Sequence, residues 1–205
     1  MAIYVGGTEL PVGGTKTIWV PANVMTPTES NGCSALQHVE GDTDYPDYSS
    51  PNFVCLDFGE MLNEHAQFTV AFPKSWNLGT ITYQVFWTGD YSNGDTVEWG
   101  LQGRAFGTGD GIWASMMYTG FPTATLIQDS TQGYPPMSEN HLCYVTPESG
   151  DVTIAGSPAD GDICYFQVLR NPEDHHGGND EDDMDADARL HGIKLFYTTD
   201  ASNDD

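Results

Sequence analysis

A run of carboxylates late in the chain is the stretch with the clearest potential for chemistry. Its acidic residues are Asp180, Glu181, Asp182, Asp183, Asp185 and Asp187. Carboxylate oxygens suit hard cations such as Ca²⁺. Asp183, Asp185 and Asp187 match the first three ligand positions of a helix-loop-helix calcium loop, but Ala188 and Lys194 replace its glycine and glutamate. A looser calcium site on Asp183, Asp185 and Asp187 and a solvated acidic loop both remain open.

Histidines flank this acidic run. His175 and His176 precede it and His191 follows it, at a spacing that fits no standard set of metal ligands. A three-fold axis could bring one histidine per subunit together, and a surface histidine pair is the alternative. Glu64 beside His65 could act as an acid–base pair. No nucleophile, phosphate-loop or dinucleotide-binding motif occurs, and we predict that the protein is not an enzyme.

Five tryptophans could stack on sugar rings. Trp87 and Trp99 fall on regularly alternating apolar faces and are therefore expected in the core. Trp76 and Trp113 follow turn residues, so we expect these two to be the exposed pair. They are the candidates for stacking on a ligand.

The elements that position these residues are predicted to be strands. In residues 65–72, Phe68, Val70 and Phe72 share one face while Gln67 and Thr69 share the other. Gly- and Pro-rich turns separate about ten such segments, and no convincing helix occurs. The pattern predicts an all-β, single-domain jelly roll or β-sandwich. Strands are expected at 17–20, 53–58, 65–72, 80–88, 97–106, 112–118, 124–127, 141–145, 152–155, 162–170 and 188–199.

The β domain is expected to span residues 16–200. Residues 1–15 carry two Gly-Gly pairs and Pro11 and predict an extended N-terminal arm, which either reaches a neighbouring subunit or stays loose. Residues 201–205 form a short acidic tail. Free buried thiols are the favoured state of Cys33, Cys55, Cys143 and Cys164, with disulfides as the alternative.

The strand at 188–199 carries apolar residues at alternating and adjacent positions. Ile193, Leu195 and Tyr197 are expected on one face, and Leu190 and Phe196 on the other, as in an interior or interface strand. Arg189 follows the carboxylates directly and is predicted to form an intersubunit ion pair. The interface candidates are Ile3, Tyr4, Val5, Arg189 and Ile193.

The chain is strongly acidic. Thirty Asp and Glu residues against six Lys and Arg residues give a formal net charge of −24. Nucleic acids and anionic membranes would be repelled, so neither is an expected partner. The charge suits solubility in a salty medium or, alternatively, divalent cation binding. No signal peptide or apolar stretch of membrane-spanning length is visible, which predicts synthesis in a cytoplasm.

Several segments resemble a family of virion structural proteins of marine tailed bacteriophages. The resembling pieces are Lys16–Pro27, Asn31–Cys33, Glu64–Trp76 and Asp183–Thr199. The resemblance implies a jelly-roll module that forms a homotrimer on the surface of a particle. Its implied partners are the major capsid protein or other virion proteins.

The main hypothesis is a capsid decoration or cement protein on the outside of the head, made in the cytoplasm of the host bacterium. The alternative is a tail-fibre or spike module that binds host glycans as a receptor. A small carbohydrate-active enzyme is a third, weaker hypothesis, which would need two inward-facing carboxylates. No cofactor is expected unless the acidic run binds calcium.

Overall fold

The computed structural model describes residues 3–5, 8–10, 13–39, 53–89, 94–111, 120–131, 142–172, 182–201 and 204. Among these residues strands dominate, and η1 (Ala22–Val24) is a single 3₁₀ turn. Twelve strands form two six-stranded sheets, so the prediction of an all-β sandwich is confirmed. In the described part of the chain, no helix has the length and apolar character needed to cross a membrane.

The first sheet, called the β9 sheet, has the order β10-β9-β13-β7-β4, with β12 beside β9. All its pairs are antiparallel except β12 with β9. Its strands are β4 (Thr26–Pro27), β7 (Glu64–Val70), β9 (Thr96–Phe106), β10 (Thr125–Ser130), β12 (Ile154–Ala155) and β13 (Ile163–Arg170).

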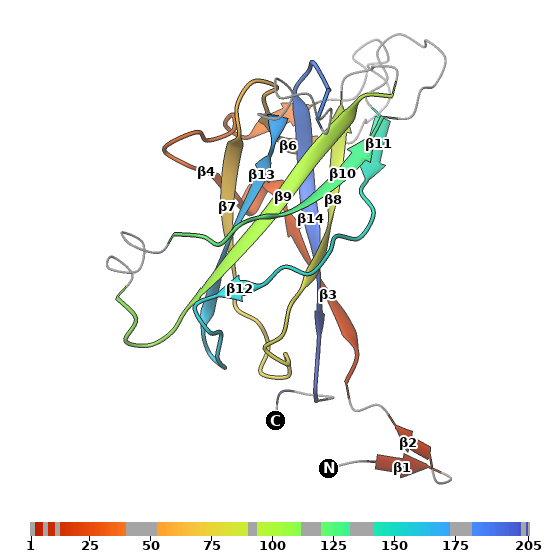
Figure 1. Cartoon of the computed structure of the whole chain (residues 1–205), viewed down its shortest axis with the longest axis vertical. Helices are drawn as coiled ribbons and strands as arrows, with labels where there is room; N and C mark the ends of the chain where they lie inside the picture. Colours follow the sequence, from red (N-terminus) through yellow and green to blue (C-terminus); the bar gives the residue numbers. More distant parts are fainter. Residues whose placement is uncertain are drawn as a thin grey trace, which may run out of the picture.

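The second sheet, called the β14 sheet, has the order β11-β8-β14-β6-β5, with β3 beside β14. Figure 1 shows the long strands of the two sheets overlying each other. Its strands are β3 (Thr15–Pro21), β5 (Gln37–Val39), β6 (Phe53–Phe58), β8 (Thr82–Gly89), β11 (Leu142–Val145) and β14 (Ala188–Thr198).

The core lies between the two sheets and is rich in aromatic side chains. Trp87 and Trp99 are completely buried, which confirms their predicted core position. Phe58 of the β14 sheet packs edge-on against Trp99 of the β9 sheet, with ring centroids 5.2 Å apart. Such contacts between sheets remove large apolar surfaces from water and hold the layers together.

A β-bulge in β14 changes the predicted facing of that strand. The register to β8 shifts between Leu190 and Gly192, so an extra residue is inserted. Leu190 and Ile193 therefore both point into the core and are fully buried, although a regular alternation would separate them. The prediction that Ile193 lies at an interface is wrong, because its side chain is buried in the core of its own subunit.

Asp182, in the acidic segment, lies inside the protein rather than in water. Asp182 is buried and accepts hydrogen bonds from Arg170 Nε (3.0 Å) and Nη2 (2.8 Å). The guanidinium also donates to the carbonyl oxygens of Phe58, Met184 and Ala186. Every N–H of Arg170 thus has a partner, and the segment after Asp182 is held against the end of the sandwich.

The arm predicted for residues 1–15 contains two strands. β1 (Ile3–Val5) and β2 (Thr8–Leu10) pair with each other in an antiparallel two-stranded sheet, separate from the sandwich sheets. The side chains of Ile3, Tyr4 and Val5 lie outside the described structure. Their role at an interface stays a prediction.

Candidate functional site

The outer surface of the β14 sheet carries a cluster of aromatic and polar side chains, called the tryptophan face below. It consists of Trp19, Gln84, Phe86, His191 and Lys194. Alternation places them there, because their strand neighbours Val20, Val85 and Trp87 are buried in the core. Trp19 is 47% exposed although it stands in a regular strand. A large aromatic ring left in water on a rigid sheet is a candidate contact for a ligand.

Trp19 is held in place by two neighbours. Its indole lies against the backbone of Gly192, where an added Cβ would approach Cη2 to 2.5 Å. Phe86 packs on it edge-to-face, with ring centroids 5.1 Å apart and an interplanar angle of 85°. Because Gly192 has no side chain, the indole can pack directly on the backbone of β14.

Lys194 and Gln84 supply polar groups next to this ring. Lys194 is the cross-strand partner of Trp19 on one side and of Gln84 on the other. Its Nζ lies 4.9 Å from the centroid of Phe86, in cation–π geometry. The Gln84 amide donates to the carbonyl oxygen of Thr146 at 2.9 Å, which fixes its orientation. The face thus combines an apolar ring with a cation and a positioned amide.

His191 borders the same face. Its Nε2 lies 3.1 Å from Thr88 Oγ1, and its ring meets Phe53, with centroids 5.6 Å apart. Burial, and then the positive charge of Arg189, lower the pKa of His191 below its usual range. The imidazole is therefore neutral at pH 7 and can exchange a hydrogen bond with a ligand or with Thr88.

A second polar surface lies on the outside of the β9 sheet and is called the glutamine face. It consists of two cross-strand rows, Gln67–Gln167–Gln102 and Thr69–Tyr165–Arg104, over β7, β13 and β9. All six side chains are exposed or half-buried. Gln67 Nε2 donates to Gln167 Oε1 at 2.7 Å. Alternation predicts that Gln67 and Thr69 face outward, but only strand order brings the three glutamines into register.

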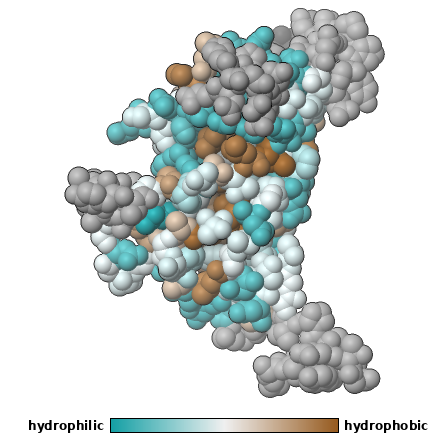
Figure 2. Space-filling model, viewed as in Figure 1, coloured by the Kyte–Doolittle hydropathy of each residue, from teal (hydrophilic) through white to brown (hydrophobic). Residues whose placement is uncertain are grey.

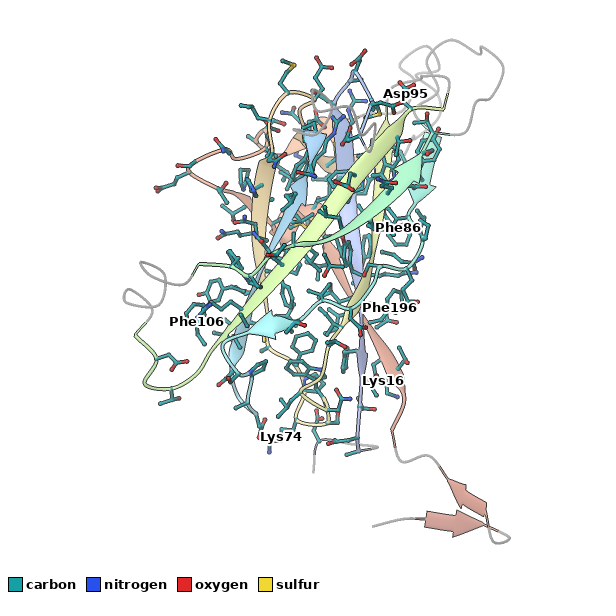
Figure 3. The ribbon with its side chains drawn as sticks, viewed as in Figure 1. Lys16, Lys74, Phe86, Asp95, Phe106 and Phe196 are labelled. Carbon is teal, nitrogen blue, oxygen red and sulfur yellow. The ribbon has the colours of Figure 1, made fainter. Side chains whose placement is uncertain are left out.

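Aromatic and apolar groups flank the glutamine rows. Tyr165 meets Phe106 edge-to-face at 5.6 Å, and the Arg104 guanidinium carbon lies 5.9 Å from the centre of the same ring. Figure 3 labels Phe106 near the lower end of β9. Leu126 is 41% exposed on β10. Figure 2 shows apolar surface over the upper part of β9 and β10, surrounded by hydrophilic surface.

The two tryptophans predicted to be exposed do not form a site in the described structure. Trp76 is only 4% exposed, so this prediction is wrong. The residue forms an isolated β-bridge with Thr199, and its ring stacks on Phe72 at a centroid distance of 4.3 Å. The turn thereby folds back over the end of the core. Trp113 lies outside the described residues.

Those metal candidates that the structure describes are not gathered into a cluster. Among the residues that the structure describes, no three His, Cys, Asp or Glu side chains come together as a metal site would require. Asp183 accepts a hydrogen bond from the backbone N–H of Thr96, whereas Asp185 and Asp187 are exposed. His175 and His176 lie outside the described residues. Calcium binding by the acidic run stays a prediction.

Arg189 was predicted to meet a carboxylate of another subunit. In the structure its Nε lies 3.5 Å from Asp57 Oδ1 of the same chain, on the neighbouring strand β6. Position 189 stands directly opposite 57 in the β14–β6 register. Cross-strand pairing of this kind stabilises a sheet, so Arg189 has a function within the subunit.

Comparison with known proteins finds solved structures at low sequence identity. No protein-family model and no curated protein matches the chain. Among solved structures, carbohydrate-binding module TmCBM61 in complex with β-1,4-galactotriose is 11% identical, with a TM-score of 0.34 and 85% of each chain covered. The non-crystalline-cellulose-specific module CBM28 is 10% identical, with a TM-score of 0.41 and coverage of 87% of this chain and 86% of that one.

The family 11 carbohydrate-binding module from Clostridium thermocellum, in complex with a β-1,3-1,4-mixed-linked tetrasaccharide, is 8% identical. Its TM-score is 0.36, with coverage of 95% of this chain and 92% of that one. The function must be inferred from the outer faces of the two sheets.

Proposed function

We propose that this protein is a glycan-binding module and that the tryptophan face holds the sugar. The observation that supports this most directly is the position of Trp19. Its ring is half exposed, although it stands on a regular strand between residues that point into the core. The sheet, rather than a loop, therefore presents the indole to solvent.

A tryptophan in this position suits a sugar ring for a physical reason. One face of a pyranose carries several C–H groups and packs well on an indole, while its rim carries hydroxyl groups that need hydrogen bonds. Lys194 lies beside Trp19 and Gln84 lies beside Lys194 on the next strand, and both can supply those hydrogen bonds. Because Gly192 and Phe86 already fix the ring, little conformational freedom is lost when a ligand binds.

Binding rather than catalysis fits the composition of this face. Hydrolysis of a glycoside typically uses two carboxyl groups on opposite sides of the scissile bond. The five residues of the tryptophan face include no carboxylate, and the nearby Asp57 is paired with Arg189. The prediction that the protein is not an enzyme is therefore part of this proposal.

The proposal is tested by glycan-array screening of the purified protein, followed by affinity measurements with the best ligand. Trp19→Ala should weaken binding at least tenfold, since truncating a central aromatic contact typically costs about 2 kcal/mol or more. Thr17→Ala is the matched control, because Thr17 is exposed two residues earlier on β3. Wild-type affinity in Trp19→Ala, or no binding to any glycan, would contradict the proposal.

A capsid decoration protein is the second candidate, and its main support is the sequence resemblance. One structural observation favours it: β1 and β2 pair apart from the sandwich, as expected of a segment that attaches to another protein. The homotrimer, the capsid partner and the virion location all stay proposals.

Labelling the protein on purified particles would test the second candidate. Density over the head would support the decoration role. Labelling at the tail tip alone would remove it and would favour a receptor-binding module, which is the viral form of the glycan-binding proposal.

A further inference from the structure

The glutamine face is a second ordered surface of polar side chains, and it is not part of the tryptophan face. It lies on the other sheet, so the sandwich core separates the two faces. Gln67, Gln167 and Gln102 are direct cross-strand neighbours on three adjacent strands. At a strand separation of about 4.8 Å, the row extends about 10 Å across the sheet.

The hydrogen-bonding capacity of this row exceeds what the protein uses. A glutamine amide offers two N–H donors and one carbonyl acceptor. Gln67 donates one N–H to Gln167 Oε1, which leaves the Gln67 oxygen and the Gln167 NH₂ group available at the surface. Gln102 continues the row on β9 and is half-buried. The row therefore presents both donors and acceptors at the surface.

The second row adds a ring and an anchored cation. Tyr165 lies one alternation step beyond Gln167 on β13, with Thr69 and Arg104 directly opposite it. Phe106 packs against the Tyr165 ring in an edge-to-face contact. Arg104 donates to the carbonyl oxygen of Gly120 at 2.9 Å and lies over Phe106. Its charge is thus engaged within the protein.

We propose that the glutamine face is a second carbohydrate-binding site and that it takes a neutral, extended polysaccharide. The chain would cross β7, β13 and β9, with its hydroxyls on the three amides and a sugar ring on Tyr165. The proposal rests on the proposed glycan-binding function, because that function defines the ligand class. It makes the protein bivalent, with one site on each sheet.

The chemistry of the face selects this ligand. A sugar hydroxyl both donates and accepts, as an amide does, so each can satisfy the other. A phosphate or sulfate only accepts and would leave the glutamine oxygens without donors. The net charge of −24 also opposes a polyanion. A neutral polymer avoids both costs and reaches all three amides at once.

Calorimetry with soluble neutral oligosaccharides, chosen from a screen of galactan, xylan, mannan and mixed-linked glucan fragments, tests the inference. The wild-type protein should bind two oligosaccharides per chain. Gln167→Leu and Tyr165→Leu should each remove one, as should Trp19→Ala on the opposite sheet. Gln37→Leu is the control, because it removes an amide from β5 of the β14 sheet. Circular dichroism and Tm establish that each variant is folded.

The outcomes separate this inference from the proposed function. One bound ligand in the wild type, lost with Trp19→Ala and unaffected by Gln167→Leu and Tyr165→Leu, would overturn the second site and leave the tryptophan site intact. If Gln167→Leu abolished all binding and Trp19→Ala left binding unchanged, the glutamine face would be supported and the tryptophan face overturned. No binding of any oligosaccharide by the wild type would overturn both.

Discussion

The indole of Trp19 rests directly on the backbone of Gly192, its neighbour on the adjacent strand. A Cβ at position 192 would lie 2.5 Å from Trp19 Cη2 and 2.7 Å from the carbonyl oxygen of Val20. Gly192→Ala should therefore displace the ring and strain the β3–β14 pair, at about 1–3 kcal/mol. We expect weaker glycan binding together with a Tm lowered by several degrees, measured by affinity titration and thermal melting. Wild-type values for both would show that the contact is not essential.

The buried ion pair between Arg170 and Asp182 should be important for stability. Asp182→Ala leaves a guanidinium without its counter-ion in a site that water does not reach, which costs about 3–5 kcal/mol. Urea denaturation monitored by tryptophan fluorescence measures the loss. Asp187→Ala, in the exposed part of the same segment, should change stability little. Replacing both partners with Arg170→Met and Asp182→Leu should recover part of the loss, because no charge is then left unpaired.

His191 should make stability depend on pH. Its pKa is lowered in the folded protein, mainly by burial, so the unfolded state binds a proton more readily. The stabilising contribution is complete above the ordinary value of 6.5 and is lost as the pH falls through the lowered pKa. Thermal melting between pH 7.5 and pH 5 should show a steeper decline for the wild type than for His191→Gln. Identical slopes would contradict this assignment.

The cysteines should differ sharply in reactivity. Burial raises the pKa of Cys33, Cys55 and Cys164 to about 12, so almost no thiolate forms at pH 8. Cys143 is exposed on β11, although partial burial also raises its pKa. Titration of the native protein with a thiol-specific chromogenic reagent should modify one thiol per chain, and all four after unfolding. Cys143→Ser should remove the native reaction, whereas rapid modification of several native thiols would contradict the burial.

The sequence predicted those parts of the fold that depend on local alternation. The strand at 53–58 occurs as expected, and Trp87 and Trp99 lie in the core because each has buried neighbours at a spacing of two. Alternation cannot reveal an inserted residue, so the bulge before Gly192 reversed the predicted facing of Leu190 relative to Ile193.

The candidate site was harder to predict than the fold. Trp76 follows a turn and appears exposed by sequence, but a bridge to Thr199, far along the chain, buries it. The sequence made no placement for Trp19, and its contacts across β14 follow from the pairing of β3 with that strand. The same is true of the three glutamines, whose rows depend on strand order. Long-range pairing therefore determines both sites, and local pattern does not encode it.

The position of β14 has a consequence for how the protein is made. This strand pairs with β3, β6 and β8, yet it follows all three in the chain. A ribosome must therefore synthesise the chain through residue 198 before the central strand of this sheet exists. Until then the earlier strands have apolar faces without a partner and need protection from aggregation. Folding of this sheet is accordingly expected to wait until β14 has been synthesised, and the tryptophan face forms only at that moment.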